Sequence, residues 1–124
     1  MGHHRFVVQE HTTAEGVHWD LMLEKGEVLV TFRLEERPEA ALRHPVGATE
    51  IFDHPLRFLT YGGPVQEGAG QVRIVDRGTY RCDEQGEDRW TLTLGGAILN
   101  GGFTVSRTQG TKWRFAPERA ANQT

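Results

Sequence analysis

An alternation of apolar and polar residues constrains this chain more than any other feature of its sequence. Between Val17 and Glu24 every second residue is apolar, which places a different set of side chains on each face of an extended segment. The apolar set consists of Val17, Trp19, Leu21 and Leu23. A turn at Lys25-Gly26-Glu27 follows, and Val28–Leu34 returns as the second arm of a hairpin. The period of two excludes a helix here and predicts a hairpin with one buried face.

Further short segments rich in β-forming residues recur along the chain, separated by turns that contain many of its 15 glycines. The further strands that we predict are Arg5–His11, Gln71–Asp76, Thr79–Cys82, Arg89–Leu94, Gly102–Arg107 and Thr111–Phe115, with short extended pieces at Ala48–Phe52 and Arg57–Tyr61. Gly78 is interpreted as a break between two of these strands, and Glu35–Arg43 is the one plausible short helix. Strands at this spacing are typical of a sandwich or barrel. We expect an all-β fold: a small, closed or nearly closed antiparallel barrel of about eight strands, with at most one short helix.

The length of 124 residues is that of a single domain, for which we predict a core of about residues 5–115 and a frayed tail at 116–124. The single cysteine, Cys82, excludes an intramolecular disulfide and suits a reducing compartment. The segment Met1–Val8 lacks the apolar core of a signal peptide, so we expect a cytoplasmic protein without a membrane partner. The sequence does not determine the oligomeric state, and a monomer is our expectation. The net charge of −3 argues against a broad basic surface, and any contact with nucleic acid should be local.

Polar residues that can bind a metal fall on one face of the first two strands. Period two places Gln9 and His11 together on the first strand, and His18 and Asp20 together on the second. If the strands pair, His11, His18 and Asp20 converge at their loop end. Two neutral imidazoles and a carboxylate suit a borderline divalent ion such as Mn²⁺, Fe²⁺ or Zn²⁺. The spacing alone also allows a solvated polar face on which the histidines are incidental.

Another histidine lies in the segment Phe52–Leu56, where Asp53 or His54 would face a site while Phe52 and Leu56 pack inside. The alternative is a loop histidine that is held by backbone hydrogen bonds. Arg57 follows this segment and would either hold a phosphate or pair with a surface acid.

These segments together resemble a known family, the 3′-phosphoesterase domain of bacterial DNA ligase D, including its stand-alone homologues. The resemblance extends from about Arg5 to Phe115. The motifs that carry it are Phe6–His11, His18–Glu24, Asp53–Phe58, Gly68–Val72 and Asp76–Tyr80. The family is a compact β-barrel enzyme of bacterial end joining that uses Mn²⁺ to remove a 3′-phosphate or 3′-ribonucleotide from a DNA end.

The resemblance implies that His11, His18 and Asp20 bind Mn²⁺ or another divalent transition metal. It also implies that Gln9 supports the catalytic site and that His54 holds the scissile phosphate. The implied partners are nucleic-acid 3′ ends, with a separate ligase, polymerase or end-binding protein acting beside the domain.

The chain departs from the family pattern at residues that concern the phosphate. Met22 stands where the family has an arginine two residues after the ligand aspartate, and Phe58 stands where it has a tyrosine. Acidic Glu35-Glu36 replaces a segment that carries a lysine in the family. Arg33, Arg43 and Arg57 are the candidates that could replace the lost positive charge.

Three interpretations remain open from the sequence. The first is an active Mn²⁺-dependent phosphoesterase, and the second is a binding module of the same fold that holds metal or nucleic acid without catalysis. The third is a small-ligand or structural barrel that is unconnected with DNA repair.

Overall fold

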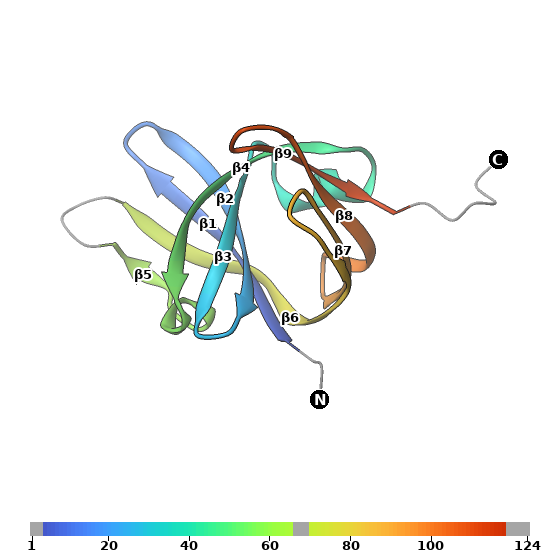
Figure 1. Cartoon of the computed structure of the whole chain (residues 1–124). Coiled ribbons are helices and arrows are strands. Elements are labelled where there is room, and N and C mark those ends of the chain that lie inside the picture. The colour runs from blue at the N-terminus through green and yellow to red at the C-terminus, as the bar shows by residue number, and fades with distance from the viewer. Residues whose placement is uncertain (1–3, 66–69, 119–124) are drawn as a thin grey trace.

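The computed structural model describes residues 4–65 and 70–118. Within these ranges the chain forms nine β-strands and two short 3₁₀ helices, η1 and η2 (Figure 1). The strands are β1 (His4–Thr13), β2 (Gly16–Lys25), β3 (Val28–Leu34), β4 (Val46–Pro55), β5 (Gly63–Pro64), β6 (Gln71–Gln85), β7 (Arg89–Gly96), β8 (Asn100–Gln109) and β9 (Lys112–Pro117). The helices are η1 (Pro38–Leu42) and η2 (Leu56–Leu59). The predicted all-β fold is confirmed.

Eight of the strands close into an antiparallel barrel in the order β1-β2-β3-β4-β9-β8-β7-β6, and pairing between β6 and β1 completes the circle. The two-residue strand β5 pairs with the beginning of β6. Closure leaves few strand edges exposed, which is a general way to avoid pairing with other chains. The prediction of a closed barrel of about eight strands is therefore confirmed.

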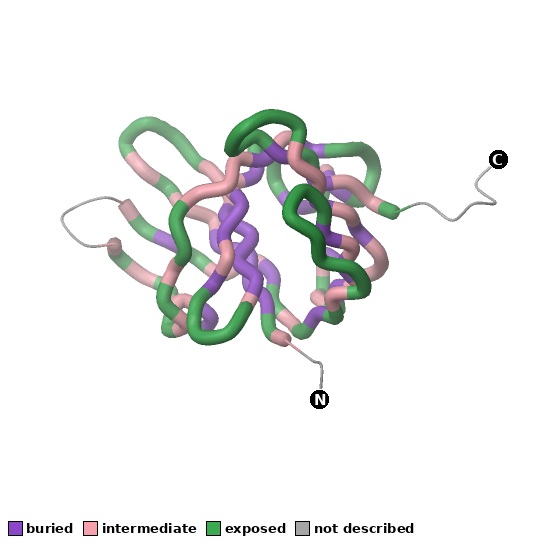
Figure 2. Tube along the Cα trace, viewed as in Figure 1, coloured by how far each residue is buried: buried purple, intermediate pink, exposed green. Residues whose placement is uncertain are grey.

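The barrel interior is filled by the apolar face of each strand. Leu21 and Leu23 of the predicted hairpin are fully buried in this core, and the ring of Phe32 packs edge-on against Trp90 and Trp113. Buried residues follow the central strands in Figure 2, while the hairpin ends are exposed. Burial of these side chains is the main stabilising contribution to such a fold.

A second, smaller apolar cluster lies on the opposite side of the same sheet. It consists of Val7, Met22, Leu29 and Leu59, with Leu56, Phe58 and Ile74 packed against it. Val7 alternates along β1 with Phe6 and Val8, which belong to the main core. Since neighbouring residues of a strand face opposite ways, this cluster marks the outer face of β1–β3, which η2 covers. The polar residues of interest share this outer face.

The predicted break at Gly78 is wrong, because β6 continues through this residue. Gly78 pairs with Phe6 of β1 on one side and with Gly96 of β7 on the other. A Cβ atom at Gly78 would lie 2.2 Å from the carbonyl oxygen of Gly95. Glycine is required here by the close approach of two backbones inside the sheet, and not by a turn.

Three local predictions also differ from the structure. Arg57 belongs to η2 and is not extended, and Phe52 does not pack inside, since 67% of its surface is exposed. Ala116 and Pro117 pair with Thr104 and Phe103 in the last ladder of the barrel, so the ordered core extends two residues beyond the predicted end. Residues 119–124 of the predicted tail, and residues 68 and 69 of the Gly68–Val72 motif, lie outside the described residues.

We expect Gly78→Ala to destabilise the barrel by about 1–3 kcal/mol or more, because the methyl group must push β6 away from β7. Gly86→Ala is the matched control: its Cβ would find its nearest neighbour, the oxygen of Arg89, at 3.5 Å. Urea denaturation of the two variants measures the difference. Equal midpoints would contradict the close approach of β6 and β7.

Candidate metal centre

The β1–β2 hairpin brings the three predicted ligands to one place. In the register of the two strands His11 lies opposite His18, and Gln9 lies opposite Asp20. Directly paired residues project to the same side of a sheet, and residues two apart on one strand do so as well. The three ligand side chains therefore leave the outer face of the barrel together, as the alternation of the sequence predicts.

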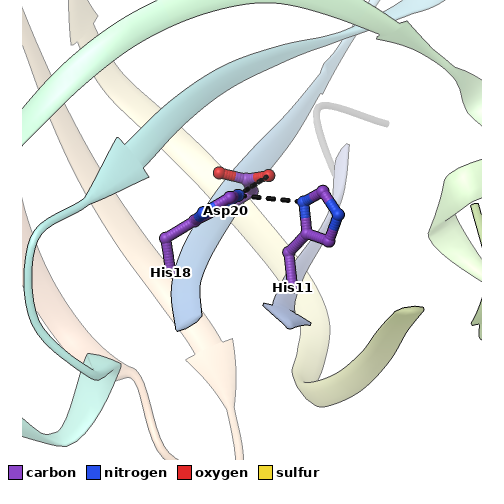
Figure 3. A group of neighbouring side chains, drawn as sticks. All are labelled: His11, His18 and Asp20. Atoms are coloured by element: carbon purple, nitrogen blue, oxygen red, sulfur yellow. Dashed lines mark hydrogen bonds and ion pairs between the residues drawn. The ribbon is translucent and has the colours of Figure 1, made fainter. Parts of the chain in front are cut away.

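The ligand atoms of His11, His18 and Asp20 all lie within 4.8 Å of one another (Figure 3). Nδ1 of His11 is 2.9 Å from Nε2 of His18, and this Nε2 is 3.8 Å from Oδ2 of Asp20. The histidine rings meet edge to face with their centroids 4.6 Å apart. Asp20 is buried, and the histidines are partly exposed.

This arrangement fits a divalent ion. Two atoms that bind one ion at about 2.1 Å and at a right angle lie about 3 Å apart. The separations of 2.9 and 3.8 Å are near this value, and the ligand atoms of the remaining pair, His11 and Asp20, lie within 4.8 Å of each other. Two imidazoles and one carboxylate leave coordination positions for water and substrate.

Burial lowers the pKa of His18, and the nearby cation Arg33 acts in the same direction, whereas the Asp20 carboxylate opposes it. The lowered pKa favours the neutral form of His18. A neutral imidazole is the form that binds metal.

Arg33 reaches this centre from the neighbouring strand. It pairs with Asp20 across β2 and β3, and its Nε donates a 3.1 Å hydrogen bond to Oδ1 of that carboxylate. The other candidate cations lie elsewhere: Arg57 sits over the ring of Phe58, 5.0 Å from its centroid, and Arg43 follows η1. Of the three, Arg33 is the one placed beside the predicted ligands.

His54 lies on the same outer face, and a buried threonine fixes its orientation. Its Nδ1 is 2.9 Å from Oγ1 of Thr31, and that hydroxyl donates its own hydrogen to the carbonyl of Leu29 at 3.0 Å. Because a hydroxyl has one hydrogen, a Thr31 hydroxyl that donates to Leu29 accepts from Nδ1 of His54. The neutral ring then carries its proton on Nδ1 and its lone pair on Nε2.

Burial also lowers the pKa of His54, while the charge of Asp20 and a hydrogen bond with the backbone of Phe52 raise it. Burial is the largest of these effects, so the ring is mostly neutral at pH 7. The charge of Asp20, one of the predicted ligands, thus acts on His54.

Gln9 connects the centre to the segment that follows His54. Its side chain is 1% exposed, and Nε2 donates hydrogen bonds of 2.9 Å to the carbonyls of Phe58 and of Tyr61. Both amide hydrogens are thus used to hold the η2 segment against β1. This geometry fits a positioning residue rather than one that contacts a substrate.

Sequence reasoning named the ligands, His54 and Arg33, but it missed Thr31 and Tyr61. Thr31 alternates with Val30 and Phe32 and lies two residues before Arg33, so the pattern could have predicted that its side chain points outward. The pattern could not have predicted its contact with His54, which lies 23 positions away.

Comparison with known proteins assigns the chain to a family. Residues 9–107 match the family model described as the DNA Ligase D 3′-phosphoesterase domain. The chain belongs to this family. The resemblance stated from the sequence motifs is confirmed, and the matched range includes all three predicted ligands, His54 and Arg33.

The curated relatives are much longer than this chain. It is 34% identical to the "Multifunctional non-homologous end joining DNA repair protein LigD" of Mycobacterium tuberculosis (strain CDC 1551 / Oshkosh) over 117 residues, which cover 87% of the chain and 15% of that protein. The corresponding proteins of Mycolicibacterium smegmatis and Pseudomonas aeruginosa are 30% and 29% identical, over 88% and 84% of the chain and 16% and 13% of their own length. No helix of membrane-spanning length and apolarity occurs in the described parts of this chain.

We expect the protein to bind Mn²⁺, and Asp20→Asn to weaken that binding by at least about 100-fold, because the substitution removes the one anionic ligand. His44→Gln is the matched control, since this exposed histidine lies after η1, outside the ligand cluster. Calorimetric titration with MnCl₂ measures both. Equal affinities for wild type and Asp20→Asn would show that the cluster does not bind the metal.

Proposed function

We propose that this chain is a Mn²⁺-dependent phosphoesterase that removes a 3′-phosphate or 3′-ribonucleotide from nucleic-acid ends during DNA end repair. The convergence of His11, His18 and Asp20 within 4.8 Å carries this proposal. Membership of the ligase D 3′-phosphoesterase family supports it, as do the names of the relatives, which are non-homologous end joining proteins.

In this proposal His11, His18 and Asp20 hold the ion. When bound there, Mn²⁺ supplies a Lewis acid that polarises a phosphoryl oxygen and lowers the pKa of a water. Arg33 lies beside this position and orients the Asp20 carboxylate through its Nε bond. Its guanidinium adds positive charge where the transferred phosphoryl group carries negative charge.

His54 acts on the phosphate in its protonated form. With Nδ1–H donated to Thr31, a proton on Nε2 makes that nitrogen a charged donor to a phosphate oxygen or to the departing 3′ oxygen. Hydrolysis then breaks the bond between phosphorus and the 3′ oxygen, water supplies the new oxygen on phosphorus, and the strand keeps a 3′-OH.

The proposed partners are nucleic-acid 3′ ends and separate ligase or polymerase activities. The chain corresponds to about 15% of the length of its mycobacterial relatives, so any joining step would be carried out by other polypeptides or domains. We propose that it acts as a cytoplasmic monomer.

A binding module without catalysis is the second candidate, and Met22 favours it. This side chain is 1% exposed and packs with Val7, Leu29 and Leu59, so no cation occupies the position of the family arginine. Phe58 likewise offers no hydroxyl beside His54, although the rings are in contact at 5.5 Å.

We expect the protein to release inorganic phosphate from a 3′-phosphorylated primer-template in the presence of Mn²⁺. His18→Ala should reduce the rate by at least about 100-fold, because it removes one of three metal ligands. His44→Gln should leave the rate unchanged. Phosphate release that is no faster than with His18→Ala would exclude the phosphoesterase and leave the binding module.

We expect kcat/KM to fall as the pH rises through the pKa of His54, since the active form is the protonated one. This fall is the alkaline limb of the pH profile. Because burial lowers the pKa of His54, we expect the limb below pH 6.5, the ordinary pKa of histidine. His54→Gln should lower kcat/KM by about 100-fold and remove the limb. Steady-state rates measured between pH 5 and 8 test this.

Thr31→Val should move the same limb to lower pH, because the charged ring loses the acceptor of its Nδ1–H. Thr31→Ser keeps that acceptor and should restore the wild-type profile. A purely structural role for Thr31 would change the rate without moving the limb, and that result would contradict the assignment.

A further inference from the structure

A row of aromatic side chains runs along the outer face beside the candidate metal centre. Phe52, His54, Phe58 and Tyr61 contact one another in sequence, with ring centroids 4.8, 5.5 and 5.7 Å apart. We call these four residues the aromatic row. Neither the metal ligands nor the phosphate contacts described above require the residues on either side of His54 to be aromatic.

The two ends of the row are open to ligands. Phe52 is 67% exposed, more than any other large apolar side chain in the described parts of the protein. At the other end Phe58 and Tyr61 line a pocket of about 390 Å³ together with Arg57, Pro64 and Val65. Its size and its largely apolar lining are those of a site for a small planar group.

The row is held rigidly relative to the metal centre. The amide of Gln9 binds the carbonyls of both Phe58 and Tyr61, and Gln9 itself pairs with Asp20 across the hairpin. The hydroxyl of Tyr61 donates to the carbonyl of Pro64, which fixes the pocket wall. A preformed surface of this kind loses little entropy when it binds.

We propose that the aromatic row binds the bases on either side of the scissile phosphate, one on Phe52 and one in the pocket of Phe58 and Tyr61. The inference rests on the proposed function, in which His54 contacts that phosphate. A phosphodiester has a nucleoside on each side, and His54 has an aromatic ring on each side. Arg57, whose guanidinium lies 5.0 Å from the centroid of Phe58, supplies a cation for the adjoining phosphate.

The spacing of the row selects unpaired nucleotides. The ring of His54 separates Phe52 from Phe58, with centroid distances of 4.8 Å to Phe52 and 5.5 Å to Phe58, whereas stacked nucleotides of a duplex strand rise by about 3.4 Å each. Bases on the row must therefore unstack from each other. The free energy of unstacking is lowest at a frayed or mismatched 3′ end. Stacking on aromatic rings is tolerant of base identity, so the surface would recognise an end without reading its sequence.

The test uses a primer-template with a 3′-OH, which carries no phosphate to release, and with 2-aminopurine as an unpaired 3′-terminal base. We expect wild-type protein to quench the 2-aminopurine fluorescence on binding, and to bind the same end more weakly when the base is paired. Phe52→Ala should weaken binding of the unpaired end by about 5- to 100-fold and reduce the quenching.

Two further Phe52 variants separate stacking from simple apolar contact. Phe52→Tyr should bind as wild type does, whereas Phe52→Leu should behave as Phe52→Ala does. Leu42→Ala is the control, since Leu42 is also an exposed apolar residue but lies on η1. Unchanged binding by Phe52→Ala, equal affinity for paired and unpaired ends, or no binding by wild type would each overturn the inference.

Phosphate release by the same proteins separates this inference from the proposed function. A wild-type protein that quenches 2-aminopurine but releases no phosphate supports the aromatic row and contradicts the phosphoesterase. If the wild-type protein is active and Phe52→Ala leaves the KM for a 3′-phosphorylated, unpaired end unchanged, the result contradicts the aromatic row and leaves the phosphoesterase standing.

Discussion

β1 is hydrogen-bonded to β2 along one edge and to β6 along the other, and its pairing with β2 determines where every candidate residue lies. The register places His11 opposite His18 and Gln9 opposite Asp20. A slip of β1 by one residue would turn Gln9 and His11 toward the barrel interior, away from His18 and Asp20, and would bring apolar residues of β1 to the surface. The main core prevents such a slip, because it requires the alternate residues of both strands. The same packing that stabilises the barrel therefore assembles the candidate metal centre.

The outer face of these strands carries an apolar cluster and, next to it, a charged cluster. Met22 and Leu29 lie in the apolar cluster beneath η2, while Asp20 and Arg33 form the outward-facing pair next to Met22 and Thr31. The boundary between them explains why His54 is partly desolvated and still responds to the charge of Asp20. Burial of one side of the centre strengthens its charged interactions, since fewer water molecules screen them. The apolar cluster thus contributes to the chemistry of the site as well as to stability.

Local pattern was sufficient to predict the hairpin, the shared face of His18 and Asp20, and the barrel class, because strand periodicity depends on neighbouring residues alone. It failed at Gly78, where the sequence shows a glycine but not the strand that passes within contact distance of it. It also failed at Phe52, because alternation does not tell whether a strand end projects beyond the elements that cover its neighbours. The contact of Thr31 with His54 joins residues on different strands, so it becomes visible when the register of β3 and β4 is known.

The pairing of β2 with β3 shows which strand supplies the positive charge near Asp20. Met22 lies opposite Thr31, and Asp20 lies opposite Arg33, so the positive charge near the carboxylate comes from β3 and not from β2. An arginine at position 22 would have to enter the apolar cluster that Met22 now fills, at a considerable cost in desolvation. A cation on the neighbouring strand avoids this cost, because Arg33 keeps contact with solvent while it binds Asp20. Met22 therefore completes the apolar cluster beneath η2, while Arg33 supplies the positive partner of Asp20 from β3.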